Sequence, residues 1–157
     1  MRALTFVLLA CGLSAFAEDN AEEKAVISTI QRVFDAMAAH DPDAARAVLS
    51  PEGRVIAARA NGTVTNISQE EFAARLATAK QKYLERMWNP KVLVRGNIAQ
   101  VWAEYDFHLD GKFSHCGIDA FTLVKNSNGW KVTGISYTAE TTGCAPSPLG
   151  VPSITKE

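Results

Sequence analysis

Residues 98–138 read IAQVWAEYDFHLDGKFSHCGIDAFTLVKNSNGWKVTGISYT, a stretch that predicts three long β-strands joined by two tight turns. Asp110-Gly111 and Asn128-Gly129 are typical of hairpin turns, because these residue types tolerate the positive φ that such turns need. Apolar and polar residues alternate along much of each run, as in strands that turn one face toward a core. We therefore predict strands over residues 98–109, 113–125 and 130–138.

Upstream of this meander, the sequence predicts helices and a small hairpin. Apolar residues recur at helical spacing up to His40, and Asn20 with Glu23 forms a capping box at the start of that helix. Asp41-Pro42 is typical of a helix start, and it predicts a short helix to Leu49. The other predicted elements are a hairpin of residues 54–60 and 63–67 around Asn61-Gly62, a long helix from the capping box at residues 68–71 to Trp88, and a short strand at 92–95.

The first 17 residues have the features of a secretory signal. Arg2 gives a positive start, residues 4–13 are an apolar run, and Ala15-Phe16-Ala17 is a small-residue cleavage site. The run is too short to span a bilayer. We expect cleavage after Ala17, with lipidation at Cys11 as the alternative. The mature chain would be a single domain over residues 18–144, followed by a flexible Pro-rich tail at 145–157, and it would lie in the periplasm or outside the cell.

Charge and cysteine content narrow the function further. Without Arg2 the chain has 15 basic and 17 acidic residues, and no basic stripe could neutralise phosphates, so nucleic-acid binding is not expected. No further segment could span a membrane. Cys116 and Cys144 remain as an even pair in an exported chain, which predicts a disulfide between them.

The chain resembles the nuclear-transport-factor-2-like superfamily, in the branch that holds SnoaL-like and ketosteroid-isomerase-like domains. The resemblance covers about residues 20–140 and rests on the element order, on residues 41–49, and on the closing segments 110–125 and 129–132. It implies an α+β, cystatin-like fold: a cone-shaped, curved antiparallel sheet wrapped around N-terminal helices and one long helix, with a deep pocket. It also implies dimerisation through the outer sheet face. In the isomerase branch a catalytic aspartate lies on the first hairpin, whereas residues 56–62 contain no carboxylate.

Strand alternation identifies the candidate pocket residues. If residues 110–112 form a three-residue loop, Phe107 pairs with His115 and Tyr105 pairs with Gly117. Tyr105, His115 and Asp119 then share a mostly apolar inward face. A slip of one residue would move His115 and Asp119 to the face opposite Tyr105.

Each candidate has a chemical and a structural interpretation. Asp119 in apolar surroundings is a candidate acid or base, or a core carboxylate bonded to Ser136, Tyr105 or Arg59. His115 is a candidate base or ligand donor, or a histidine at a strand end near the pocket rim. Tyr105 is a ligand contact or a packing aromatic, and Arg59 holds an acidic ligand or lies at the surface. No metal-ligand spacing is present, and we expect neither a metal nor a cofactor.

Three functions follow from these residues. The first is a non-catalytic or weakly catalytic domain that binds a small ligand, apolar or of mixed polarity, through Tyr105, His115, Asp119 and Arg59. The second is an isomerase, dehydratase or cyclase with Asp119 or His115 as general acid/base. The third is a dimeric association module. For the homodimer we predict an apolar outer sheet face formed by Trp102, Ile118, Ile135 and Tyr137.

Overall fold

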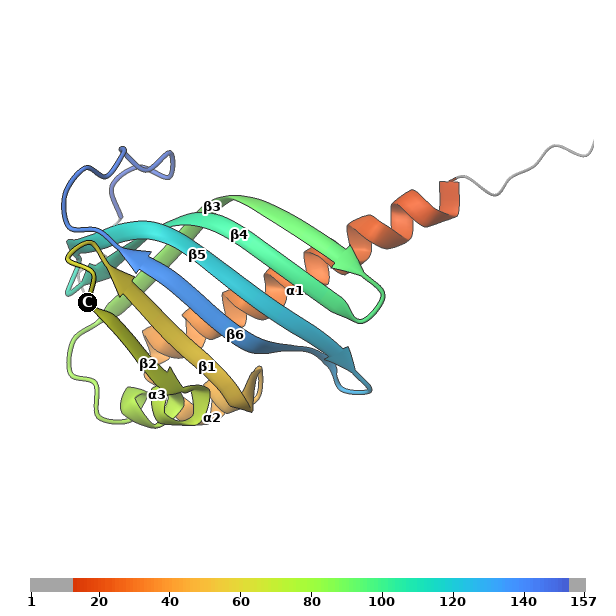
Figure 1. Ribbon diagram of the computed structural model, residues 1–157, viewed down its shortest axis with the longest axis horizontal. Helices are drawn as coiled ribbons and strands as arrows, with labels where there is room; N and C mark the ends of the chain where they lie inside the picture. The colour runs from red at the N-terminus through yellow and green to blue at the C-terminus, as the bar shows by residue number, and fades with distance from the viewer. Residues whose placement is uncertain (1–12, 153–157) are drawn as a thin grey trace, which may run out of the picture.

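The computed structural model describes residues 13–152, with side chains from residue 20 onward (Figure 1). Three helices precede or interrupt a single sheet of six strands. The elements are α1 (Leu13–Ala39), α2 (Pro42–Arg46), β1 (Leu49–Arg59), β2 (Val64–Ser68), α3 (Gln69–Leu76), β3 (Tyr83–Arg95), β4 (Ile98–Leu109), β5 (Lys112–Asn126) and β6 (Gly129–Ala139).

The sheet is curved and open, in the order β2-β1-β6-β5-β4-β3. All neighbouring strands are antiparallel except β1 and β6, which pair in parallel. Helix α1 crosses the concave face of the sheet, and α2 and α3 lie at one end of it (Figure 1). The predicted α+β class with a curved sheet around N-terminal helices is therefore confirmed, with one parallel pair in a sheet that was predicted to be antiparallel.

The core lies between α1 and the concave face. Val26, Ile30 and Val33 of α1 are buried against strand residues that include Leu123 and Val132. Because these positions recur every three or four residues, they form one stripe along the helix. The predicted start of this helix at Asn20 is wrong, since α1 already begins at Leu13. The predicted signal segment lies largely outside the described residues, and cleavage after Ala17 stays a prediction.

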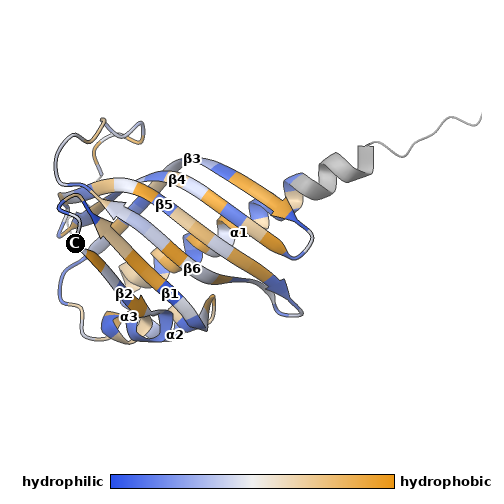
Figure 2. Cartoon of the chain, viewed as in Figure 1, coloured by the Kyte–Doolittle hydropathy of each residue, from blue (hydrophilic) through white to orange (hydrophobic). Residues whose placement is uncertain are grey.

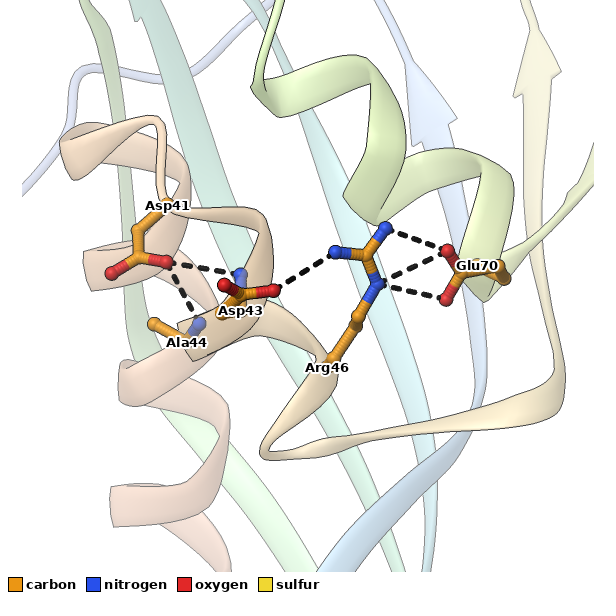
Figure 3. A network of polar contacts seen from close by, with 5 residues as sticks. All are labelled: Asp41, Asp43, Ala44, Arg46 and Glu70. Atoms are coloured by element: carbon orange, nitrogen blue, oxygen red, sulfur yellow. Dashed lines mark hydrogen bonds and ion pairs between the residues drawn. The ribbon is translucent and has the colours of Figure 1, made fainter.

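The two other predicted helix starts are confirmed. The Asp41 carboxylate accepts hydrogen bonds from the backbone N–H groups of Asp43 and Ala44, and the Ser68 hydroxyl accepts one from that of Glu71. Between these helices, Arg46 forms a bidentate pair with Glu70 and a further ion pair with Asp43 (Figure 3). The short helix ends at Arg46, before the predicted Leu49, because Leu49 already pairs with Val132 of β6.

The long helix predicted to end at Trp88 is wrong in its second half. Helix α3 ends at Leu76, and residues 83–88 form the first part of β3. Here tertiary pairing with β4 overrides helical propensity. Asn89-Pro90 does not end the element but forms an irregularity within β3, between the pairs that involve Trp88 and Lys91. Proline is tolerated at this position because β3 is an edge strand.

The predicted outer face of β6 is also wrong. Ile135 and Tyr137 point inward, whereas Trp102 is 55 % exposed on the outer face. The cause is a β-bulge: Val132 pairs with Leu123, but Gly134 pairs with Thr122, so Thr133 is an extra residue on β6. A bulge reverses the alternation beyond it. Ile135 and Tyr137 therefore lie on the same face as Val132.

Beyond β6 the chain is fastened to the outer face of the sheet. The predicted disulfide joins Cys116 of β5 to Cys144, with Cα atoms 6.0 Å apart. Arg86 of β3 donates a hydrogen bond of 3.0 Å to the carbonyl of Gly150, and it also pairs with Asp106 beneath this segment. Flexibility of the tail stays a prediction, and residues 153–157 lie outside the described part. None of the helices in the described part is long and apolar enough to cross a membrane.

Candidate functional site

A cavity of about 260 Å³ lies between α1, α3 and the concave face of the sheet. Its walls are mainly aromatic and aliphatic, and six of the lining side chains are titratable: Tyr83, Glu85, Tyr105, His115, Asp119 and Tyr137. An engineered apolar cavity of about 150 Å³ already admits benzene. This cavity is therefore large enough for a ligand of about two fused rings.

Strand register arranges the polar side chains in rows across the sheet. Glu85, Phe107 and His115 form one row across β3, β4 and β5, because Phe107 pairs with both of the others. Asp119 and Tyr137 pair in another row across β5 and β6. The predicted pairing of Phe107 with His115 and of Tyr105 with Gly117 is confirmed, but the three-residue loop behind that prediction is wrong. Leu109 pairs with Lys112 across a two-residue turn, and the extra residue Ser114 then shifts the register to the predicted one.

Gly117 lies between these two rows on β5. Because it has no side chain, the side chain of Tyr105 on β4 can extend over β5 to reach β6. The Tyr105 hydroxyl donates a 2.7 Å hydrogen bond to the carbonyl of Thr138. A Cβ atom at residue 117 would lie 2.2 Å from that same carbonyl oxygen, so glycine is required for the close approach of β5 and β6. Tyr105 is 1 % exposed, and its hydroxyl proton is already committed to Thr138 rather than to the cavity.

Glu85 and Asp119 form a coupled pair of carboxyl groups in the cavity wall. Burial raises the pKa of Glu85 to about 7, although the hydrogen bond with Asp119 lowers it. Burial, the charge of Glu85 and the same hydrogen bond raise the pKa of Asp119 well above its ordinary value. Asp119 Oδ2 is buried, and no described group donates a hydrogen bond to it. Two carboxyl groups that share one proton can supply this bond, because like charges in an apolar site do not both ionise.

His115 is held as a neutral ring among aromatic side chains. Its ring stacks on Tyr137 at 6.4 Å between centroids and lies 5.1 Å from the ring of Phe107. Burial, followed by the positive charge of Arg59, lowers the pKa of His115. Burial, followed by the charge of Glu85, raises the pKa of Tyr137, so its hydroxyl stays protonated. The cavity therefore offers hydrogen-bond donors at neutral pH without a fixed positive charge in its wall.

Arg59 lies in a neighbouring hollow and does not line the cavity itself. This hollow, of about 520 Å³, runs between α3 and strands β1 and β2. It shares four lining residues with the cavity, namely Val55, Phe72, Tyr83 and Tyr137. The two spaces therefore adjoin along these side chains.

Of the four predicted ligand contacts, the structure brings His115, Asp119 and Tyr105 to one cavity and leaves Arg59 beside it. Their roles in binding stay predictions. The sequence analysis does not identify Glu85 as a site residue, because it predicts a helix over residues 83–88. In the strand that forms instead, Tyr83 and Glu85 point toward the cavity. No group of three metal-ligating side chains occurs among the described residues.

Comparison with known proteins places this architecture in a family. A family model described as "Putative lumazine-binding" matches residues 21–138. This chain belongs to that family. The lumazine-binding family is itself one of nuclear-transport-factor-2-like domains, so the resemblance found in the sequence is confirmed. No curated protein sequence matches the chain.

Solved structures share the fold of this family member at low sequence identity. A nuclear-transport-factor-2-like protein with a cystatin-like fold from Novosphingobium aromaticivorans has a TM-score of 0.67 and 14% identity, over 87% of this chain and 93% of the other. A superfamily member from Salmonella enterica serovar Typhimurium has a TM-score of 0.64 and 16% identity, over 81% and 96%. A protein of unknown function from Mycobacterium tuberculosis has a TM-score of 0.68 and 14% identity, over 82% and 78%.

Proposed function

We propose that this protein binds a small, planar molecule, apolar or of mixed polarity, in the cavity between α1 and the sheet. The observation that carries this proposal is the cavity itself, with apolar walls and a few converging polar groups, as is usual for small-molecule sites. The shared proton of Glu85 and Asp119 and the hydroxyl of Tyr137 would be donated to acceptor atoms of the ligand. The aromatic rings of Phe107 and Tyr137 would pack on its faces.

The description of the family supports a planar heterocyclic ligand. Lumazine is a fused two-ring compound whose carbonyl oxygens and ring nitrogens accept hydrogen bonds. Such a molecule matches a cavity of about 260 Å³ in which one protonated carboxyl group and the Tyr137 hydroxyl would be the donors. Lumazine is therefore the first compound to test.

A cavity-filling variant tests this function. Replacing Ile135 by tryptophan adds a ring to the cavity wall, and we expect it to weaken lumazine binding at least tenfold in a fluorescence titration, because the ring occupies the ligand's space. Leu149→Trp is the matched control, since Leu149 is 51 % exposed and lines neither the cavity nor the hollow. Circular dichroism checks folding, and Ile135→Phe is the milder variant. No binding by the wild type, or equal binding by Ile135→Trp, would contradict the proposal.

A second candidate is a proton-transfer enzyme of the isomerase, dehydratase or cyclase type. The Glu85–Asp119 pair favours it, because one protonated and one ionised carboxyl group can act as acid and base on the same ligand. His115 is the other candidate base. Deuterium uptake at a carbon of the bound compound in D₂O, lost in Asp119→Asn, would favour the enzyme. Unchanged ligand in both proteins would favour simple binding.

We also propose a homodimer through the outer face of β3, β4 and β5. Four apolar side chains are exposed there, namely Leu93, Ile98, Trp102 and Val124, and apolar residues are frequent in this part of the sheet (Figure 2). Clustered exposed apolar residues are typical of partner surfaces. We expect native mass spectrometry to show two chains per particle, and Trp102→Asp to give one. Phe113→Asp, at the other end of the sheet, should leave the dimer intact. A monomeric wild type would refute this part.

The disulfide supports export as the setting of this function. Disulfides persist in oxidising compartments and are rare in the cytosol. We therefore propose a periplasmic or extracellular protein, in which the Cys116–Cys144 bond keeps residues 144–150 on the outer face of the sheet.

A further inference from the structure

The side chains that line the hollow between α3, β1 and β2 are suited to bind an anion. Its lining contains two arginines, Arg59 and Arg75, and no acidic side chain. Arg75 is paired with Glu71 at 2.6 Å. Arg59 is not part of any of the six ion pairs in the described part of the chain. One uncompensated guanidinium therefore faces this hollow.

Arg59 is close enough to the cavity for its charge to influence two of the lining side chains, His115 and Tyr137. Burial is the main influence on both His115 and Tyr137, lowering the pKa of His115 and raising that of Tyr137, and the positive charge of Arg59 acts to lower both. Tyr137 also lines both spaces. A ligand that packs on Tyr137 in the cavity can therefore extend past this ring toward the guanidinium without leaving the protein surface.

The two spaces differ sharply in what they can hold. The cavity has apolar walls and a coupled carboxyl pair, so an ionised acidic group there would meet like charge and lack a cation. The hollow contains the cation, together with the side chains of Thr65 and Asn66 as polar neighbours. Guanidinium groups bind carboxylates, sulfonates and phosphates through paired, charge-assisted hydrogen bonds.

We propose that the ligand is an amphipathic anion, with a planar apolar part in the cavity and an acidic group in the hollow beside Arg59. This inference rests on the proposed binding function and adds the chemical class of the ligand. It assigns Arg59 the role of selecting acidic ligands over neutral ligands of the same shape.

A matched pair of fluorescent dyes tests the proposal. 1-Anilinonaphthalene-8-sulfonate and N-phenyl-1-naphthylamine have the same ring system, and only the first has an acidic group. We expect the wild type to bind the sulfonate more tightly, and Arg59→Gln to weaken its binding about tenfold while changing that of the neutral dye less than twofold. Arg59→Lys should keep most of the preference. Arg95→Gln, which removes the same charge far from the hollow, should change neither affinity.

The outcomes separate this inference from the function on which it rests. Ile135→Trp should weaken both dyes if they occupy the cavity. If it does so and Arg59→Gln leaves the sulfonate affinity unchanged, or lowers both affinities equally, the anion proposal is overturned while the binding function stands. If Ile135→Trp spares both dyes, they bind outside the cavity and the anion proposal is overturned, whereas the binding function is still decided by the lumazine titration. Circular dichroism of each variant excludes loss of folding as the cause.

Discussion

Replacing Arg86 by methionine is expected to lower the free energy of unfolding by about 3–5 kcal/mol. Arg86 forms two hydrogen bonds with Asp106, at 2.9 and 2.5 Å, and the two side chains are only 15 % and 7 % exposed. Burial acts to raise the pKa of Asp106, but the bonds from Arg86 and His108 outweigh it and keep the pKa low. Without Arg86 this carboxylate would remain buried without its main partner.

The exposed pair of Arg46 and Glu70 is the control for this measurement. Arg46 forms an equally bidentate pair with Glu70, but these side chains are 40 % and 49 % exposed (Figure 3). Exposed pairs contribute up to about 1 kcal/mol. Urea unfolding at pH 7 with the disulfide intact should therefore show a small effect for Arg46→Met and a large one for Arg86→Met.

A double variant identifies the cause of the loss. Arg86→Met combined with Asp106→Leu removes both charges, and it should recover much of the lost stability because no unpaired charge stays buried. Equal losses in Arg46→Met and Arg86→Met would contradict the argument. So would a double variant that is less stable than Arg86→Met alone, because the loss would then come from packing or from the contact with Gly150.

The part of the fold that sequence alone predicts well is the part with local signals. Asp110-Gly111 predicts the β4–β5 turn, but the three-residue loop that was expected there is a two-residue turn, because Leu109 pairs with Lys112. Tyr105, His115 and Asp119 share one face as predicted only because Ser114 is an extra residue on β5, which restores the expected pairing. Bulges carry no such signal. The extra residue Thr133 reverses the alternation in β6, and no residue type near it predicts a bulge.

Glu85 could not be identified as a site residue because residues 83–88 were predicted to be helical and form a strand. Residues 83–88 follow a genuine helix and are compatible with helical periodicity, so the helix predicted to reach Trp88 includes Glu85. Its strand conformation depends on pairing with residues 104–109, twenty positions or so along the chain. Because the partner of Asp119 comes from this strand, the carboxyl pair could not be predicted, although Asp119 itself could.

Replacing Asp119 by asparagine is expected to make the protein more stable than the wild type at alkaline pH, by an amount that grows with pH. The folded pKa values of Glu85 and Asp119 lie above those of the unfolded chain. Well below the ordinary carboxyl pKa of about 4, both states are protonated and these groups do not affect stability. As the pH rises, the unfolded chain releases these protons first, so stability falls by up to about 1.4 kcal/mol per pH unit for each group. For Glu85 the loss is complete once the pH passes about 7.

Asp119→Asn removes the part of this loss of stability that comes from ionisation of Asp119. An asparagine amide can also donate to the Glu85 carboxylate, which lets Glu85 ionise more easily and acts in the same direction. The informative quantity is the difference between variant and wild type in urea unfolding from pH 4 to 9, because other groups, such as His115, contribute equally to both. Glu23→Gln removes an exposed carboxyl group of α1 and should give a nearly constant difference. A constant difference for Asp119→Asn as well would mean that Asp119 is ionised in the folded protein, and that no proton is held between the two carboxyl groups.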